Sequence, residues 1–215
     1  MLVIYPAAWC MRGFLFSLTT GIPSCKIFSP VFPLSEPMLW IKKIFLIPAL
    51  LLPFFVQAQE EDLIKWSSER KLQWRDYLAE PDTRSGAAAS TSTQIGFEYH
   101  VRDNNLTYTI TCKFSKTKSW GRYKNDYILS HEQGHFDIAE IFTRKLVKAL
   151  KEYSYNSSTY RNDLKTIYSE AMKDKEQFQR QYDNETDYSR NKPKQEEWLK
   201  KIEKMLNEFK DYADY

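Results

Sequence analysis

Two stretches in the middle of the chain, residues 95–101 and 106–114, alternate between hydrophobic and other side chains. Their hydrophobic positions are Ile95, Phe97, Tyr99, Val101, Leu106, Tyr108, Ile110, Cys112 and Phe114. The four residues between them, Arg102-Asp103-Asn104-Asn105, favour a tight turn. Because successive side chains of a strand point to opposite faces, the pattern predicts an antiparallel hairpin with one buried face.

A helical period replaces this alternation after residue 125. The first expected helix begins at Asn125 or Asp126, since either residue is a favourable N-cap. Its hydrophobic positions recur at intervals close to 3.6 and are Ile128, Ile138, Phe142, Leu146 and Leu150. A second helix is expected after residues 157–159, and a third opens near Pro193. A small antiparallel sheet packed on three helices is an α+β fold.

Residues 38–58 have the pattern of a secretory signal peptide. Lys42 and Lys43 precede an apolar run from Ile44 to Val56, and Ala58 supplies a small residue before a cleavage site. The run is too short to span a bilayer comfortably, so we expect no stable membrane span after cleavage. Residues 1–37 are then an upstream extension from a mis-called start, with an N-terminal membrane anchor as the alternative. Residues 59–215 are expected to form a single domain.

The charge balance and the cysteines limit the possible functions. The chain has 31 basic and 28 acidic residues, and removal of residues 1–58 leaves 27 of each. A nearly neutral domain without a basic, aromatic-rich patch predicts no nucleic-acid partner. Cys112 is the single cysteine after residue 58, so an intramolecular disulfide is excluded there. No cysteine follows the apolar run closely enough for lipid attachment, and we expect a secreted or periplasmic protein.

The sequence His131-Glu132-Gln133-Gly134-His135 falls in the first turns of the first expected helix. Positions four apart on an α-helix differ by about 40° around its axis, so both imidazoles can face one ion. Neutral imidazole is a good zinc ligand, and the glutamate can accept a proton from zinc-bound water. We therefore expect His131 and His135 to bind Zn²⁺, with Glu132 as the general base.

Gly134 is unusual inside a helix, where glycine is about 1 kcal/mol less favourable than alanine. One interpretation is the close approach of a neighbouring strand that binds extended substrate. The other is crowding in the hydrophobic core.

A catalytic zinc site usually has three protein ligands, so one ligand is still required. Asp137 and Glu140 are on the same helix, but they lie about 120° and about 180° from His131 around its axis. The third ligand is therefore expected from another segment. Its obvious source is the acidic sequence 182–188, which separates the second and third expected helices.

Several of these motifs resemble a known family. The run from Leu129 to Glu140 is similar to the signature of the predicted secreted zinc-dependent proteases grouped as domain of unknown function 922. Further matches, in order, are Trp66 with Arg70-Lys71-Leu72-Gln73-Trp74, Ala87-Ala88, Ser119-Trp120, Tyr182-Asp183 with Glu185-Thr186, and Gln195 with Trp198. The resemblance implies an exported, zincin-like metallohydrolase with its motif on the first of the three helices.

The resemblance also implies which residues complete the site. Asp183 matches the family pattern and is expected to be the third ligand. Many relatives have His-Gly where this chain has Tyr188-Ser189, so a histidine ligand at that point would be missing. Asp137 and Glu140 belong to the matching signature and are expected to orient the ligands. The alternative third ligands are Glu185, Asp187 and Tyr188.

Together these features predict an exported zinc metallopeptidase that acts on a peptide or protein substrate. Glu132 would take a proton from zinc-bound water and pass it to the leaving amine. A catalytically inactive, zinc-stabilised domain that binds a component of the cell envelope is the alternative. A non-peptidase hydrolase that uses the same water is a third hypothesis.

Overall fold

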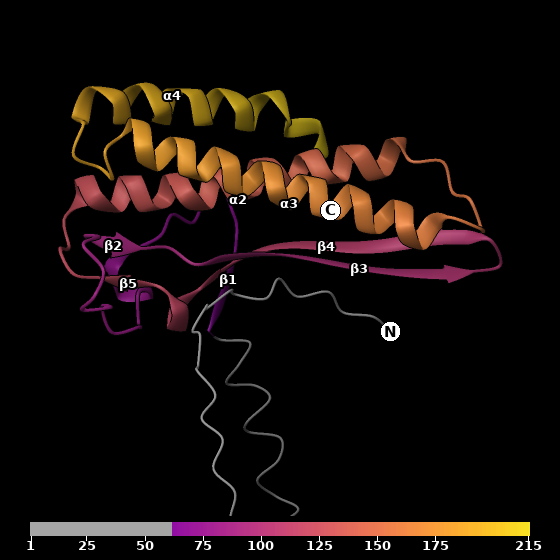
Figure 1. Ribbon diagram of the computed structural model, residues 1–215, viewed down its shortest axis with the longest axis horizontal. Coiled ribbons are helices and arrows are strands. Elements are labelled where there is room, and N and C mark those ends of the chain that lie inside the picture. Colours follow the sequence, from indigo (N-terminus) through magenta and orange to yellow (C-terminus); the bar gives the residue numbers. More distant parts are fainter. Residues whose placement is uncertain (1–61) are drawn as a thin grey trace, which may run out of the picture.

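The computed structural model describes residues 62–215, so the expected upstream extension and signal peptide lie outside the described residues. Helices α2 (Asp126–Glu152), α3 (Tyr160–Glu185) and α4 (Lys192–Glu208) form a helical layer, and the strands lie below α2 and α3 in Figure 1. The predicted α+β fold is confirmed. Within the described range, no helix is both long and apolar enough to span a lipid bilayer.

The strands form two antiparallel sheets. The larger has the order β1-β4-β3 and contains β1 (Leu63–Lys65), β3 (Thr93–Arg102) and β4 (Asn105–Ser115). The smaller consists of β2 (Ala89–Ser90) and β5 (Trp120–Gly121). Short 3-10 helices are present at Trp74–Asp76, Lys116–Lys118 and Lys210–Tyr212.

The predicted hairpin is confirmed as β3 and β4. Phe97 pairs with Ile110, and both belong, with Ile95, to the hydrophobic core that the helices also form, as the alternation requires. The turn between the strands consists of Asp103 and Asn104, whose φ angles are 50° and 58°. Asp and Asn tolerate this left-handed conformation, which two-residue hairpin turns need at both positions.

Helix α2 is the centre of the structure. Asn125 caps it, since its Oδ1 atom accepts a hydrogen bond of 2.9 Å from the backbone N–H of Ile128. The helix lies between the sheet and the other two helices (Figure 1), so the residues from 134 to 144 are all buried, polar ones included. A surface helix has one apolar face, whereas α2 must satisfy its buried polar groups by contacts inside the protein.

Helix α3 extends further than the sequence pattern indicated. The acidic sequence 182–188 was expected to separate two helices, but α3 continues to Glu185 and includes Asp183 in its last turn. The end of the helix is a Schellman-type motif: the N–H of Tyr188 donates to the carbonyl of Asp183 (2.9 Å), and Asp187 has a left-handed φ of 47°. Asp183 is therefore held by a helix rather than by a loop.

The connection between α3 and α4 contains three consecutive residues with positive φ. They are Asp187 (47°), Tyr188 (51°) and Ser189 (71°). A left-handed conformation costs a residue with a side chain about 1–2 kcal/mol, and glycine avoids that cost. The surrounding hydrogen bonds, such as Asn191 N–H to the Thr186 carbonyl at 2.8 Å, hold the strained segment in place.

We predict that Ser189→Gly stabilises the protein by about 0.5–1 kcal/mol, because glycine adopts this φ without a steric penalty but loses more backbone entropy on folding. Ser189→Ala is the control, since it keeps the Cβ atom and should give no such gain. Urea unfolding of the two variants measures the difference. Equal stability of both variants would contradict the strain assigned to this residue.

Candidate metal centre

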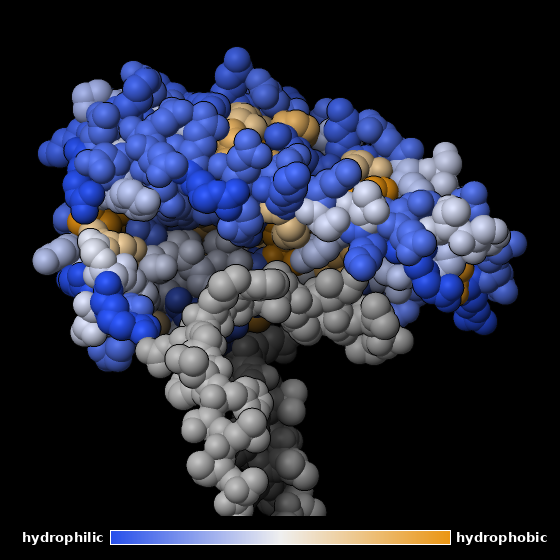
Figure 2. Space-filling view, viewed as in Figure 1, coloured by the Kyte–Doolittle hydropathy of each residue, from blue (hydrophilic) through white to orange (hydrophobic). Residues whose placement is uncertain are grey.

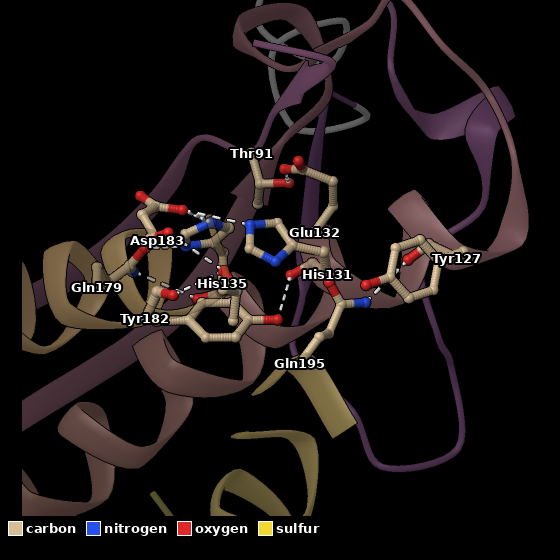
Figure 3. A network of polar contacts seen from close by, with 10 residues as sticks. Thr91, Tyr127, His131, Glu132, His135, Gln179, Tyr182, Asp183 and Gln195 are labelled. Atoms are coloured by element: carbon tan, nitrogen blue, oxygen red, sulfur yellow. Dashed lines mark hydrogen bonds and ion pairs between the residues drawn. The ribbon is translucent and has the colours of Figure 1, made fainter. Parts of the chain in front are cut away.

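Three side chains from two helices converge on one point (Figure 3). His131 and His135 lie one turn apart on α2, and Asp183 reaches them from the last turn of α3. The Asp183 Oδ1 atom is 3.3 Å from His131 Nε2 and 3.0 Å from His135 Nε2. The structure thus brings together both expected histidine ligands and the first choice for the third. Their ligand atoms all lie within 4.8 Å of one another, and the group could hold a metal ion.

The spacing and chemistry of this group suit a small divalent cation. Ligand atoms bound at the usual Zn²⁺ distances in a tetrahedral site are roughly 3.3–3.4 Å apart. The two separations from Asp183, 3.3 and 3.0 Å, are close to that value. Two imidazole nitrogens and one carboxylate oxygen are also a donor set of hydrolytic zinc sites. The donor types and these two separations therefore fit a small divalent cation such as Zn²⁺.

Gln179 fixes the orientation of the His135 ring. Its Oε1 atom lies 2.5 Å from His135 Nδ1, and its Nε2 donates to the His135 carbonyl at 3.3 Å. When Nδ1–H donates to this oxygen, Nε2 keeps its lone pair free on the side of Asp183. Sequence reasoning missed Gln179. The signal that would have identified it is an amide four residues before the acidic candidate, on the same helical face.

Tyr182 packs behind the two imidazoles. Its ring stacks on that of His131 with centroids 4.5 Å apart and an interplanar angle of 20°, and its Oη donates to the His131 carbonyl (3.2 Å). The same ring fills the space beside Gly134, where an added Cβ would lie 2.6 Å from the Tyr182 Oη. Crowding in the core is therefore the correct interpretation of Gly134, because its neighbour is this buried tyrosine and not a substrate-binding strand.

The hydrogen bonds of Asp137 and Glu140 go to residues other than the two imidazoles that they were expected to orient. They lie on other sides of α2, as the helical angles require, and each accepts one hydrogen bond from a distant segment and one from a residue four positions away on α2 itself. The donors, at 2.5–2.8 Å, are Trp66 and Gln133 for Asp137, and Arg144 and Tyr215 for Glu140. Through Trp66 and Tyr215, the two carboxylates connect α2 to the beginning and the end of the described chain.

The alternative third ligands lie elsewhere. Glu185 accepts a hydrogen bond from Trp198 Nε1 at 2.9 Å, and Asp187 pairs with Arg190 at 3.3 Å. Neither carboxylate belongs to the group of ligand atoms around the two histidines. Tyr188 does line the cleft at this group, although its side chain is half exposed. Among the four candidates, Asp183 is the one that contacts both imidazoles.

Glu132 lines a cleft of about 190 Å³ together with the metal group and residues 88–91. Its Oε2 atom accepts a hydrogen bond of 2.6 Å from Thr91 Oγ1, and the Thr91 hydroxyl is 2.8 Å from that of Tyr77. Figure 3 shows the Glu132 carboxylate turned toward Thr91, on the same side of α2 as the imidazoles. Thr91 was not predicted, because nothing distinguishes it from the other Ser and Thr residues near it.

The carboxylate of Asp183 and the imidazole of His135 each stabilise the charged form of the other. Burial raises the pKa of Asp183, but the hydrogen bonds and charges of His131 and His135 outweigh it and hold that pKa below its ordinary value. Burial lowers the pKa of His135, yet Asp183 and the charge of Glu132 outweigh it and raise that pKa. In the metal-free protein, His135 therefore tends to carry a proton that a metal ion must displace.

Residues 67–190 match the model of a family described as "Bacterial protein of unknown function (DUF922)". The chain belongs to this family, and the predicted family membership is confirmed. The matched range contains α2, α3 and every residue of the metal group. No curated protein and no solved structure matches the chain.

We predict that Gly134→Ala destabilises the protein although alanine is the better helix former. Overpacking against the Tyr182 ring costs about 1–3 kcal/mol, whereas the gain in helix propensity is about 1 kcal/mol. Urea unfolding measures the effect. Gly86→Ala is the control, because a Cβ there meets nothing within 4 Å. Stabilisation of the protein by Gly134→Ala would show that Tyr182 does not constrain this position.

We predict that the metal-free protein loses stability as the pH rises from 6 to 8. The folded-state pKa of His135 is raised, so its pairing with Asp183 contributes fully below the unfolded-state pKa of about 6.5. That contribution disappears as the pH rises through the folded-state pKa. Urea unfolding of chelator-treated protein at several pH values measures it. Asp183→Asn should flatten the dependence, and an unchanged slope would contradict the assignment.

Proposed function

We propose that the chain is an exported zinc-dependent metallopeptidase. The observation that carries the proposal is the convergence of His131 Nε2, His135 Nε2 and Asp183 Oδ1 in a cleft that Glu132 also lines. An ion held there by three protein ligands keeps a fourth position for water, which is the arrangement of hydrolytic zinc sites. Export is proposed from the sequence pattern of residues 38–58 alone.

The residues have separate roles in the proposed reaction. His131, His135 and Asp183 would hold the ion, and bound Zn²⁺ supplies acidification of water and polarisation of the scissile carbonyl. Glu132 accepts the proton of the attacking water and passes it to the leaving amine. Thr91 donates its hydrogen bond to Oε2 of Glu132, so Oε1 is the oxygen left to receive the proton.

Strand β2 supports a peptide as the substrate. In the described part of the chain it pairs with β5 along one edge, while residues 88–91 line the cleft at the metal group. A strand edge without a neighbour presents backbone N–H and C=O groups that can pair with an extended peptide. Such a peptide would cross the cleft as an added strand, beside Glu132. This arrangement favours a peptidase over a hydrolase of compact substrates.

We predict that Glu132→Gln retains bound zinc but lowers peptide hydrolysis by at least about 100-fold, because it removes the general base. Asp183→Ala should lose both the metal and the activity. Metal content by mass spectrometry and cleavage of a peptide library, with a chelator control, measure the two properties separately.

Retained hydrolysis by Glu132→Gln would remove Glu132 from the mechanism. A zinc-loaded wild-type protein that cleaves no peptide would instead favour a zinc-stabilised binding domain. Failure of the wild-type protein to take up zinc would contradict both functions.

A further inference from the structure

A second cavity, of about 630 Å³, adjoins the cleft at the metal group. The two cavities share part of their walls, namely Ala88, Tyr188 and Ser189. The larger one is therefore adjacent to the place where a scissile bond would lie. Its size is within the range of about 300–1,000 Å³ that is typical of ligand pockets. We call this second cavity the aromatic groove, because Tyr123, Tyr127 and Tyr188 all line it.

The aromatic groove contains most of the exposed large hydrophobic side chains of the described residues. Within residues 62–215, these side chains are Leu78, Tyr123 and Tyr188, and their exposures are 55%, 61% and 50%. The two tyrosines line the groove, whereas Leu78 does not. Figure 2 also shows a small patch of hydrophobic colour at the left edge of the molecule, between the helical layer and the lobe that contains β2 and β5, although tyrosine itself is drawn pale on this scale. Exposed hydrophobic residues that gather in one place indicate a binding surface.

The charged residues of the groove are both cationic. Arg190 and Lys192 line it and no acidic residue does. The Lys192 Nζ atom lies 5.3 Å from the centroid of the Tyr127 ring, which is a cation–π distance. Arg190 pairs with Asp187, which lies outside the lining, and this partner offsets part of its charge. The groove therefore has aromatic walls, one cation beside a tyrosine ring, and only a limited excess of positive charge.

We propose that the aromatic groove is a subsite for a bulky aromatic side chain of the peptide, next to the bond that is cut. An aromatic ring can contact the tyrosine walls edge to face and receive Lys192 on its own face at the same time. An aliphatic side chain makes neither interaction. An acidic one could pair with Lys192, but it would gain nothing from the tyrosine faces, and the charge of Arg190 is already offset by Asp187. The inference rests on the proposed peptidase function, which places the peptide across the metal group. The binding that the inference requires can be measured without turnover.

The first experiment incubates the zinc-loaded full chain with a randomised peptide library and identifies the cleavage sites by mass spectrometry. We expect Phe, Tyr or Trp at one fixed position beside the cut, enriched at least tenfold over Ala. Tyr123→Ala and Lys192→Gln should each reduce the enrichment several-fold. Gly86→Phe should do the same, since Gly86 lines the groove and has open space beside its Cα. Leu78→Ala is the matched control and should leave the enrichment unchanged.

The second experiment measures binding by the zinc-loaded Glu132→Gln variant, using fluorescence anisotropy. The probes are labelled peptides that are identical except for one residue, which is Phe, Leu, Glu or Ala. We expect the Phe peptide to bind at least tenfold more tightly than the others, and the added change Tyr123→Ala to abolish the difference. Preferential binding of the Phe peptide without any cleavage by the wild-type protein would overturn the peptidase function and support the subsite.

Two results would overturn the subsite while the peptidase function stands. One is cleavage without a preferred residue beside the cut. The other is enrichment of acidic residues there, which would assign the specificity to Arg190 and Lys192 alone. If the variant binds all four peptides equally and the wild-type protein cleaves none, both the peptidase function and the subsite are wrong.

Discussion

The ring of Tyr182 lies between α2 and α3 and determines how the two helices meet at the metal group. It stacks on His131, donates a hydrogen bond to the backbone of α2 and fills the space left by the missing side chain of Gly134. Because the ring is fully buried, it has no free space into which it could move. The next residue, Asp183, is therefore held with its Oδ1 atom 3.0 Å from His135 Nε2 and 3.3 Å from His131 Nε2. The convergence of the three side chains depends on this packing.

Because α2 is buried, many of its polar side chains form hydrogen bonds or ion pairs inside the protein. A polar group that leaves water without a hydrogen bond destabilises the fold, and a charge does so more strongly. Glu140 pairs with Arg144, and Asp137 accepts hydrogen bonds from Trp66 and Gln133. At the metal group the two imidazoles share one carboxylate. Metal binding to these side chains would be coupled to the stability of the folded domain, since the same contacts hold α2 against α3.

The cleft and the aromatic groove meet where three different parts of the fold come together. They are the short strand β2, the beginning of α2 and the connection between α3 and α4. That connection carries the left-handed residues 187–189, two of which line both cavities. Strained backbone is commonly found where a structure holds a side chain at a functional position. Here the strain places Tyr188 at the boundary between the metal group and the groove.

Local periodicity was enough to predict the hairpin, the three helices and the placement of His131 and His135 on one side of a helix, because these features depend on residues close together in the sequence. Geometry along the same helix also argued against Asp137 and Glu140 as ligands, but it could not show what they contact. Asp183 was selected by family resemblance, and the sequence pattern placed it in a loop instead of the last turn of α3.

Only the tertiary structure identified Gln179 and Thr91, which reach the site from positions 44 and 41 residues away from their partners. The neighbour of Gly134 and the aromatic groove were likewise decided by the packing of separate elements. The sequence by itself determined which residues have the chemistry to bind a metal and activate water. Which of them lie within bonding distance was decided by the packing of α3 on α2, since contacts between distant segments leave no periodic pattern in the chain.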